Sequence, residues 1–121
     1  MLSDTFAQAF ARDWIDAWNA QDLSRILAHY TDDFEMSSPF IAAIAGEPSG
    51  VLKGKVAVGS YWQAALEKFP DLHFELIHVT KGASSVVLVY HSVGGRLAAE
   101  VFYFNAEGLV YLAGGNYGID I

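Results

Sequence analysis

The chain has 121 residues, 53% of them hydrophobic and 14% aromatic, so we expect a single domain over residues 1–121 with its own core. A formal net charge of −7 argues against nucleic acid or an anionic membrane surface as partner, because both need a positive field. The absence of cysteine excludes disulfides and thiolate chemistry. With no signal-peptide pattern and no apolar run of about 18 residues, we expect a cytoplasmic protein.

The first predicted element is an amphipathic helix with Ser3 or Asp4 as its N-cap. Its apolar stripe consists of aromatic rings at i, i+4 spacing: Phe6, Phe10, Trp14 and Trp18. Rings of this kind pack against a sheet, and they can also line a ligand cavity. Asp22 is the expected cap of a second, shorter helix, whose apolar face is Leu23, Ile26, Leu27 and Tyr30.

A short strand over residues 34–36 follows, and then a long loop over residues 37–54 that is rich in glycine and proline. A loop of this length in a compact domain is often functional, so we expect it to form a rim or lid over a cavity. A third helix is predicted from about Lys55 to Phe69, with Pro70 as its stop.

The remainder has the period of strands: residues 72–80, a hairpin over residues 84–105, and residues 109–117. Gly94-Gly95 predicts a two-residue turn, which sets His91 opposite Ala98 and Val89 opposite Glu100. The predicted architecture is an α+β domain with three helices on one face of an antiparallel sheet.

Glu100 is the residue that stands out, because a carboxylate falls within an apolar row of the sheet. Three interpretations remain open. In the first, the carboxyl lies in an apolar cavity with a raised pKa and serves as acid, base or hydrogen-bond donor. In the second, it forms a structural ion pair with His91 or Arg96. In the third, the register is off by one and Glu100 lies on the outer face.

Several segments resemble the nuclear-transport-factor-2-like superfamily: residues 14–23, residues 30–34, Ser38-Pro39, Gly50 and Gly54 before the third helix, and residues 101–104 with Gly108. The chain is most similar to its SnoaL-like branch and to the ketosteroid isomerases. The resemblance implies a cone-like, cystatin-like roll, in which a strongly bent antiparallel sheet holds three N-terminal helices in its concave face, with a ligand cavity between them. It indicates the fold more than an activity.

The resemblance also implies where isomerase groups would fall. The general base would fall on Ser38, which cannot abstract a carbon-bound proton unaided. The first oxyanion donor would fall on Trp14, whose indole can donate one hydrogen bond. The second donor, a protonated acid, would fall on Glu100. We therefore do not expect a steroid isomerase, although other chemistry in the same cavity stays open.

Other kinds of site are not indicated. The four histidines lack a spacing that would bring several to one face, so we expect no metal site. No phosphate-binding loop or nucleophile elbow is present, and no cofactor is implied.

The leading hypothesis is a cofactor-independent enzyme of the isomerase or cyclase type that acts on a hydrophobic small molecule bearing a carbonyl. Glu100 would be its acid or base and His91 the partner of Glu100. The expected cavity wall is Trp14, Trp18, Phe34, Met36, Ser38, Trp62, Phe69, Phe102 and Tyr117. The alternatives are a non-catalytic binding module and a homodimeric structural protein.

The outer face of the sheet is predicted to be apolar as well, which favours a homodimer packed sheet to sheet. Its expected residues are Val86, Leu88, Tyr90, Leu97, Ala99, Val101 and Tyr103.

Overall fold

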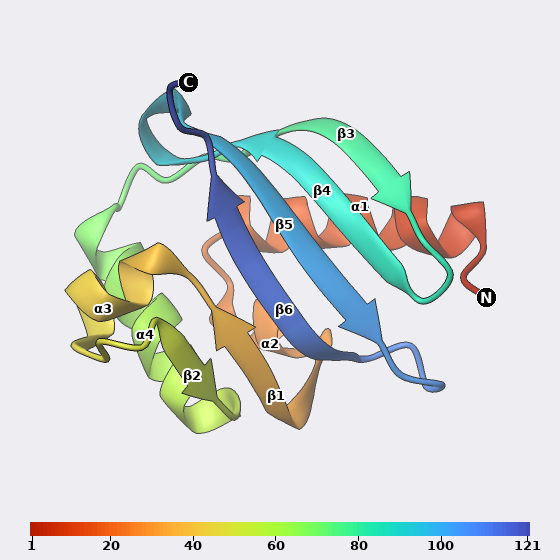
Figure 1. The fold of residues 1–121 in the computed structure, drawn as a ribbon, viewed down its shortest axis with the longest axis horizontal. Helices are drawn as coiled ribbons and strands as arrows, with labels where there is room; N and C mark the ends of the chain where they lie inside the picture. The colour runs from red at the N-terminus through yellow and green to blue at the C-terminus, as the bar shows by residue number, and fades with distance from the viewer.

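Helices cover one face of a single curved sheet in the computed structural model, which describes residues 1–121 (Figure 1). The helices are α1 (Asp4–Asn19), α2 (Leu23–Leu27), α3 (Pro39–Ala45) and α4 (Lys55–Lys68). The strands are β1 (Tyr30–Ser37), β2 (Val51–Lys53), β3 (Glu75–Lys81), β4 (Ser85–His91), β5 (Leu97–Phe104) and β6 (Val110–Tyr117). The strand order is β2-β1-β6-β5-β4-β3, and Figure 1 shows α1 crossing behind β4 and β5. The α+β architecture predicted from the sequence is confirmed.

The two helices predicted near the N-terminus form with the expected caps, and the helix predicted over residues 55–69 forms as α4. The Ser3 hydroxyl accepts a hydrogen bond from the Phe6 amide at 3.0 Å, and the Asp22 carboxylate accepts one from the Arg25 amide at 3.2 Å. Each cap satisfies a backbone N–H that has no partner within the helix. None of the helices combines the length and the apolarity needed to cross a membrane.

The prediction of one long loop over residues 37–54 is wrong, because this segment contains α3 and β2. Ser38 caps α3, Pro39 occupies its first turn, and Gly46 ends it in the left-handed conformation with φ 75°. The helix has only seven residues and is almost uniformly apolar, so it lacks the periodicity by which helices are identified in a sequence. Ile41 anchors it in the core with no exposed surface.

The sheet is mixed, whereas an antiparallel sheet was predicted. β1 pairs with β6 in parallel and with β2 in antiparallel orientation, and the remaining neighbours are antiparallel. The strand predicted over residues 72–80 begins only at Glu75. Ahead of it, the Asn19 side chain donates to the Phe74 carbonyl at 2.9 Å and accepts from the Phe74 amide at 2.6 Å. These two bonds replace strand pairing and fix Phe74 against α1.

The predicted register of the β4–β5 hairpin is wrong by one residue. The Ser92 amide bonds to the Arg96 carbonyl at 2.7 Å, so the loop contains three residues, Val93–Gly95, and not the two glycines alone. Leu88 therefore lies opposite Glu100, where Val89 was predicted. A one-residue shift moves every side chain of a strand to the other face.

The shift exchanges the two faces predicted for β4, whereas the side chains of β5 keep their predicted faces. Val86, Leu88 and Tyr90 point to the buried face, where each is at most 1% exposed. They had been predicted on the outer face, which instead carries Val87, Val89 and His91. Glu100 lies on the inner face and is 4% exposed. The third interpretation, in which Glu100 lies on the outer face, is therefore wrong.

A four-residue turn over residues 105–108 predicts Glu100 opposite Ala113, with Tyr111 on the same side of the sheet. In the structure the β5–β6 register at Glu100 differs from this prediction by two residues, which preserves the face of each side chain. Phe104 pairs with Val110, a bulge follows, and Glu100 then lies opposite Gly115. Tyr111, predicted on the Glu100 side, falls in the bulge and is 45% exposed.

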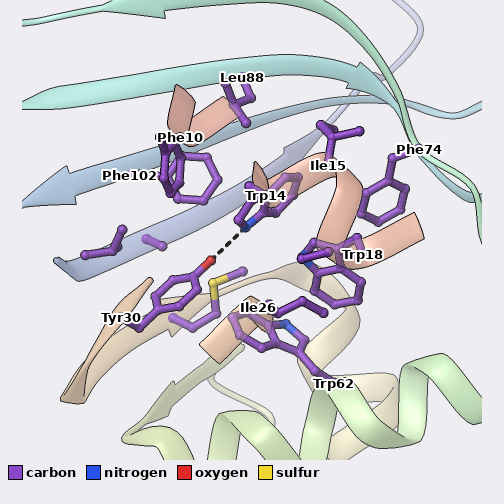
Figure 2. Packing of buried hydrophobic residues seen from close by; sticks show 14 of the residues in the cluster. Phe10, Trp14, Ile15, Trp18, Ile26, Tyr30, Trp62, Phe74, Leu88 and Phe102 are labelled. Carbon is purple, nitrogen blue, oxygen red and sulfur yellow. Dashed lines mark hydrogen bonds between the residues drawn. The ribbon is translucent and has the colours of Figure 1, made fainter. Parts of the chain in front are cut away.

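The core lies between α1 and the sheet and is dominated by aromatic rings, as Figure 2 shows around Trp14. Phe102 and Tyr90 contact the Trp14 indole edge-to-face, at ring-centroid distances of 5.2 Å and 5.3 Å, and Phe74 stacks on it at 5.8 Å. Phe10 extends the cluster toward the N-terminus through Phe102 at 4.8 Å. The aromatic stripe predicted for the first helix therefore packs against the sheet.

Candidate functional site

A pocket of about 280 Å³ opens between the helices and the concave face of the sheet. Of the 17 residues that line it, 14 are hydrophobic. They are Trp14, Trp18, Met36, Phe40, Ile44, Tyr61, Trp62, Ala65, Phe69, Leu72, Phe74, Tyr90, Ser92, Val93, Arg96, Glu100 and Tyr117. A concave, mainly apolar pocket with few polar groups is typical of small-molecule sites.

Glu100 is the only acidic residue among the lining residues. It lies on β5 between Leu88 of β4 and Gly115 of β6, and it is 4% exposed. No cationic side chain forms a salt bridge with it, so the ion pairs with His91 or Arg96 that the sequence left open do not form. The carboxyl group is thus buried without a compensating positive charge.

The partner of Glu100 is Tyr90, whose phenol donates a hydrogen bond of 2.9 Å to Oε1. Burial raises the pKa of Glu100 from 4.5 to about 7, and the hydrogen bond from Tyr90 lowers it by a smaller amount. Both protonation states of the carboxyl are therefore populated near neutral pH. A group in this condition can give up a proton and take one back, as a general acid or base requires.

Further phenols surround the carboxyl. Burial raises the pKa of Tyr61 and of Tyr117, and the negative charge of Glu100 adds to the increase in both. Gly115 lies beside the carboxyl and one of the phenols, since a Cβ atom at this position would be in van der Waals contact with Glu100 Oε1 and with the Tyr117 hydroxyl, each at 3.5 Å. The absence of a side chain at Gly115 leaves space beside the carboxyl.

Trp14 cannot donate a hydrogen bond to a ligand in this structure. Its indole N–H donates to the Tyr30 hydroxyl at 3.0 Å, which is the dashed line in Figure 2. The role of oxyanion donor that the family resemblance implied for this position therefore has no free N–H to perform it. The Trp18 indole N–H is buried without a hydrogen-bond partner, and its ring packs edge-to-face on Trp62 at 5.4 Å.

Six of the nine residues expected in the cavity wall line the pocket: Trp14, Trp18, Met36, Trp62, Phe69 and Tyr117. The other three are buried nearby but do not line it. Phe34 packs on Tyr30 at 4.3 Å, and Phe102 on Trp14 at 5.2 Å. The Ser38 hydroxyl accepts a hydrogen bond from the Phe40 amide at 3.2 Å as the cap of α3.

The expectation that His91 is the partner of Glu100 is wrong, because the two side chains lie on opposite faces of the sheet. The one-residue shift places His91 on the outer face, opposite Leu97, where it is exposed. Its Nδ1 atom lies 3.3 Å from the Gly95 carbonyl, within its own loop. His91 therefore has no part in the pocket.

Sequence reasoning missed Tyr90, which it placed on the outer face. The signal was available in β4, since the alternating set Val86, Leu88 and Tyr90 is larger and less polar than the set that ends in His91. It also missed Phe40 and Ile44, because α3 was taken for a loop. Nothing in the local sequence points to Phe74, which the Asn19 side chain brings into the wall.

No three His, Asp or Glu side chains lie close enough together in the structure to hold a metal ion. The pocket also has no cluster of cations for a phosphate-bearing cofactor, since Arg96 is its only basic lining residue. The chemistry available from the residues present is proton transfer at Glu100.

The chain is similar to proteins of one family. A family model described as a SnoaL-like domain matches residues 11–111. A SnoaL-like protein of unknown function from Burkholderia thailandensis is 53% identical, with a TM-score of 0.93 over 98% of this chain and 100% of that one. No curated protein sequence matches the chain.

Two more distant structures share the fold. One, from Agrobacterium tumefaciens, is assigned as an isomerase of the SnoaL-like family, at 17% identity and TM-score 0.75 over 95% of this chain and 99% of that one. The other is SalBIII, an epoxide hydrolase/cyclase-like enzyme with a role in pyran ring formation in the polyether salinomycin. It is 16% identical, with TM-score 0.75 over 98% of this chain and 95% of that one. At such identities the likeness is one of fold.

Proposed function

The chain belongs to the SnoaL-like family, and we propose that it binds an apolar small molecule in the pocket and uses Glu100 as the acid or base of an isomerase- or cyclase-type reaction. The observation that carries this proposal is the position of Glu100, a buried carboxyl with no cationic partner in a mainly apolar pocket. Isolated buried acids of this kind are costly to the fold and are frequent in active sites.

In the proposed reaction, Glu100 gives one proton to the substrate and takes one back from another atom. Neutral Glu100 donates its proton to a carbonyl or ether oxygen of the substrate, and the resulting carboxylate keeps the hydrogen bond from Tyr90. The same carboxylate then accepts a proton from another atom of the substrate, so that the carboxyl group is restored at the end of the turnover. No redox step or cofactor is needed. Two relatives of this fold are described as an isomerase and as a cyclase-like enzyme, which supports this class of reaction.

The second candidate is a binding module without catalysis. It is favoured by the lack of a second acid or base that titrates near neutral pH, since neither Ser38 nor His91 lines the pocket and burial raises the pKa of its phenols. In that case Glu100 would fix one polar group of the ligand by a hydrogen bond, and the apolar wall would supply most of the affinity.

One experiment separates the two candidates. The wild-type protein and Glu100→Gln are incubated with apolar unsaturated ketones and with apolar epoxides, while binding is followed by calorimetry and product formation by mass spectrometry. Binding with turnover that Glu100→Gln abolishes supports the enzyme. Binding without turnover in either protein supports the module, and an absence of both would remove the pocket as the functional site.

For the opposite face of the sheet, we propose a homodimer packed sheet to sheet. The outer surface of β4, β5 and β6 also carries the polar residues His91 and Asn116 but is mainly apolar, with Val87, Val89, Leu97, Ala99, Val101, Tyr103 and Leu112. Leu97 is 47% and Tyr103 is 37% exposed in the single chain, and burying such a patch against its own copy is favourable.

The test introduces a charge at the centre of that patch. We expect Val101→Lys to give monomers in sedimentation experiments at concentrations where the wild type is dimeric. Val56→Lys is the matched control, because Val56 is 87% exposed on α4, away from the sheet. A wild type that sediments as a monomer at micromolar concentration would overturn the proposal.

A further inference from the structure

Arg96 lies at the edge of the pocket, immediately before β5. Its guanidinium carbon is 5.4 Å from the centroid of the Phe40 ring and 5.6 Å from that of Tyr117. The two rings pack edge-to-face at 4.7 Å and thereby connect α3 with β6. These contacts hold a positive charge beside the opening, because an aromatic face attracts a guanidinium.

No acidic side chain of the protein pairs with Arg96. None of the four ion pairs in the structure includes Arg96, and its guanidinium makes no side-chain hydrogen bond. Its side chain is exposed, while the ring contacts restrict where the guanidinium can lie. A planar guanidinium with free N–H groups matches the geometry of a carboxylate, which it can bind through two parallel hydrogen bonds.

We propose that the ligand of this pocket is an apolar molecule that carries a carboxylate, bound with the carboxylate on Arg96 and the apolar body against the aromatic wall. This inference rests on the proposed function, since it names the class of ligand that the same pocket takes. A monoanion fits better than a phosphate. The pocket offers only one cation, and the chain has a formal net charge of −7, which disfavours a doubly charged ligand.

The interior of the pocket is compatible with such an anion. Besides burial, the charge of Glu100 raises the pKa of four phenols, those of Tyr90, Tyr117, Tyr61 and Tyr30, from three strands and α4. All four are therefore neutral at physiological pH. Glu100 itself is mainly neutral below about pH 7, so a bound carboxylate meets no like charge there.

The test compares two probes of nearly the same shape, naphthylacetate and its neutral amide, naphthylacetamide. Affinities are measured by calorimetry at pH 6 and low salt. For the wild type we expect the carboxylate to bind roughly fivefold more tightly than the amide, in the range for a partly exposed ion pair. Arg96→Gln should abolish this preference, so that the variant binds the carboxylate no more tightly than the amide.

Two further variants sharpen the assignment. Arg12→Gln removes the same charge from an exposed position on α1 outside the pocket and should keep the full preference. Arg96→Lys keeps the charge without the planar fork and should keep only part of it. If both probes bind the wild type equally, or the amide binds better, the inference is wrong while the pocket stands. If neither probe binds, both the inference and the proposed function are wrong.

Discussion

The phenol of Tyr90 donates a 2.9 Å hydrogen bond to Oε1 of Glu100, and both side chains are at most 4% exposed. Tyr90 lies diagonal to Glu100 on the inner face, because Leu88 is directly opposite Glu100 and Tyr90 is opposite Ala98. This bond stabilises the ionised carboxyl, whereas burial opposes ionisation and is the larger effect. At high pH the buried carboxyl of Glu100 is ionised, and this lowers the free energy of unfolding.

The first prediction is that Glu100→Gln stabilises the fold at alkaline pH. Because the pKa of Glu100 is raised from 4.5 to about 7, its contribution to stability is complete below pH 4.5 and is lost as the pH rises through about 7. At about 1.4 kcal/mol for each pKa unit, the loss amounts to about 3 kcal/mol at pH 8. Glutamine cannot ionise, so the variant should exceed the wild type by up to this amount at pH 8 and should match it near pH 4.5.

Urea unfolding at the two pH values measures the difference. Glu35→Gln serves as the control, because Glu35 is an exposed acid on β1, and it should change the free energy of unfolding by less than about 0.5 kcal/mol. A Glu100→Gln protein that is less stable than the wild type at pH 8 would show that an ion pair, and not burial alone, governs this carboxyl.

The second prediction concerns Tyr90→Phe, which keeps the ring that packs on Trp14 and Phe74 and removes only the hydroxyl. Loss of the hydrogen bond should raise the pKa of Glu100 above about 7, since that bond lowers it in the wild type. The cost in unfolding free energy should be about 2 kcal/mol at pH 8, where the acceptor is charged, and about 1 kcal/mol at pH 5. A carbon NMR titration of the labelled carboxyl group reads out the pKa directly, and an unchanged midpoint would contradict the assignment.

The amino-acid pattern placed Glu100 on the inner face correctly, because the inward parity of β5 depends only on residues within that strand. The partner of Glu100 was not predicted, because it depends on the length of the loop over residues 93–95. Two glycines suggested a two-residue turn, and the true three-residue loop exchanged His91 for Tyr90 on the inner face. A local error of one residue thus changed the predicted chemistry from an ion pair to a phenol–carboxyl pair.

Other features of the site lie beyond local patterns. The bond between Trp14 and Tyr30 joins residues 16 positions apart, and the bonds of Asn19 to Phe74 span 55 positions. Such contacts arise only once the helices have docked on the sheet. The spacing of apolar residues, by contrast, was enough to place α1 and α4, since it is repeated over several turns of each helix.

The third prediction is a near-neutral effect for His91→Ala. His91 is exposed on the outer face, and the one hydrogen bond of its ring is with the carbonyl of Gly95. We expect the free energy of unfolding to change by less than about 0.5 kcal/mol and the titration of Glu100 to stay as in the wild type. A shift in the Glu100 midpoint in this variant would restore the pairing that the sequence suggested and would argue against the register described above.

The last prediction uses two neighbouring glycines of β6 that point to opposite faces. A methyl group at Gly115 would lie 3.5 Å from both Glu100 Oε1 and the Tyr117 hydroxyl, an ordinary contact distance that the fold can accept. It would nevertheless fill the space beside the carboxyl. Gly115→Ala should therefore weaken binding of naphthylacetamide several-fold and raise the pKa of Glu100 further, because it removes room for water and ligand atoms.

Gly114→Ala is the matched control. Its methyl group would meet the Ser37 hydroxyl at 2.9 Å on the outer face, so it should lower thermal stability slightly, through a side chain that can rotate away, and leave binding unchanged. Calorimetry and the carboxyl titration on both variants test the pair. Equal binding by Gly115→Ala and the wild type would mean that ligands do not enter the space between Glu100 and Tyr117, and the proton transfer proposed for Glu100 would then have no substrate atom within reach.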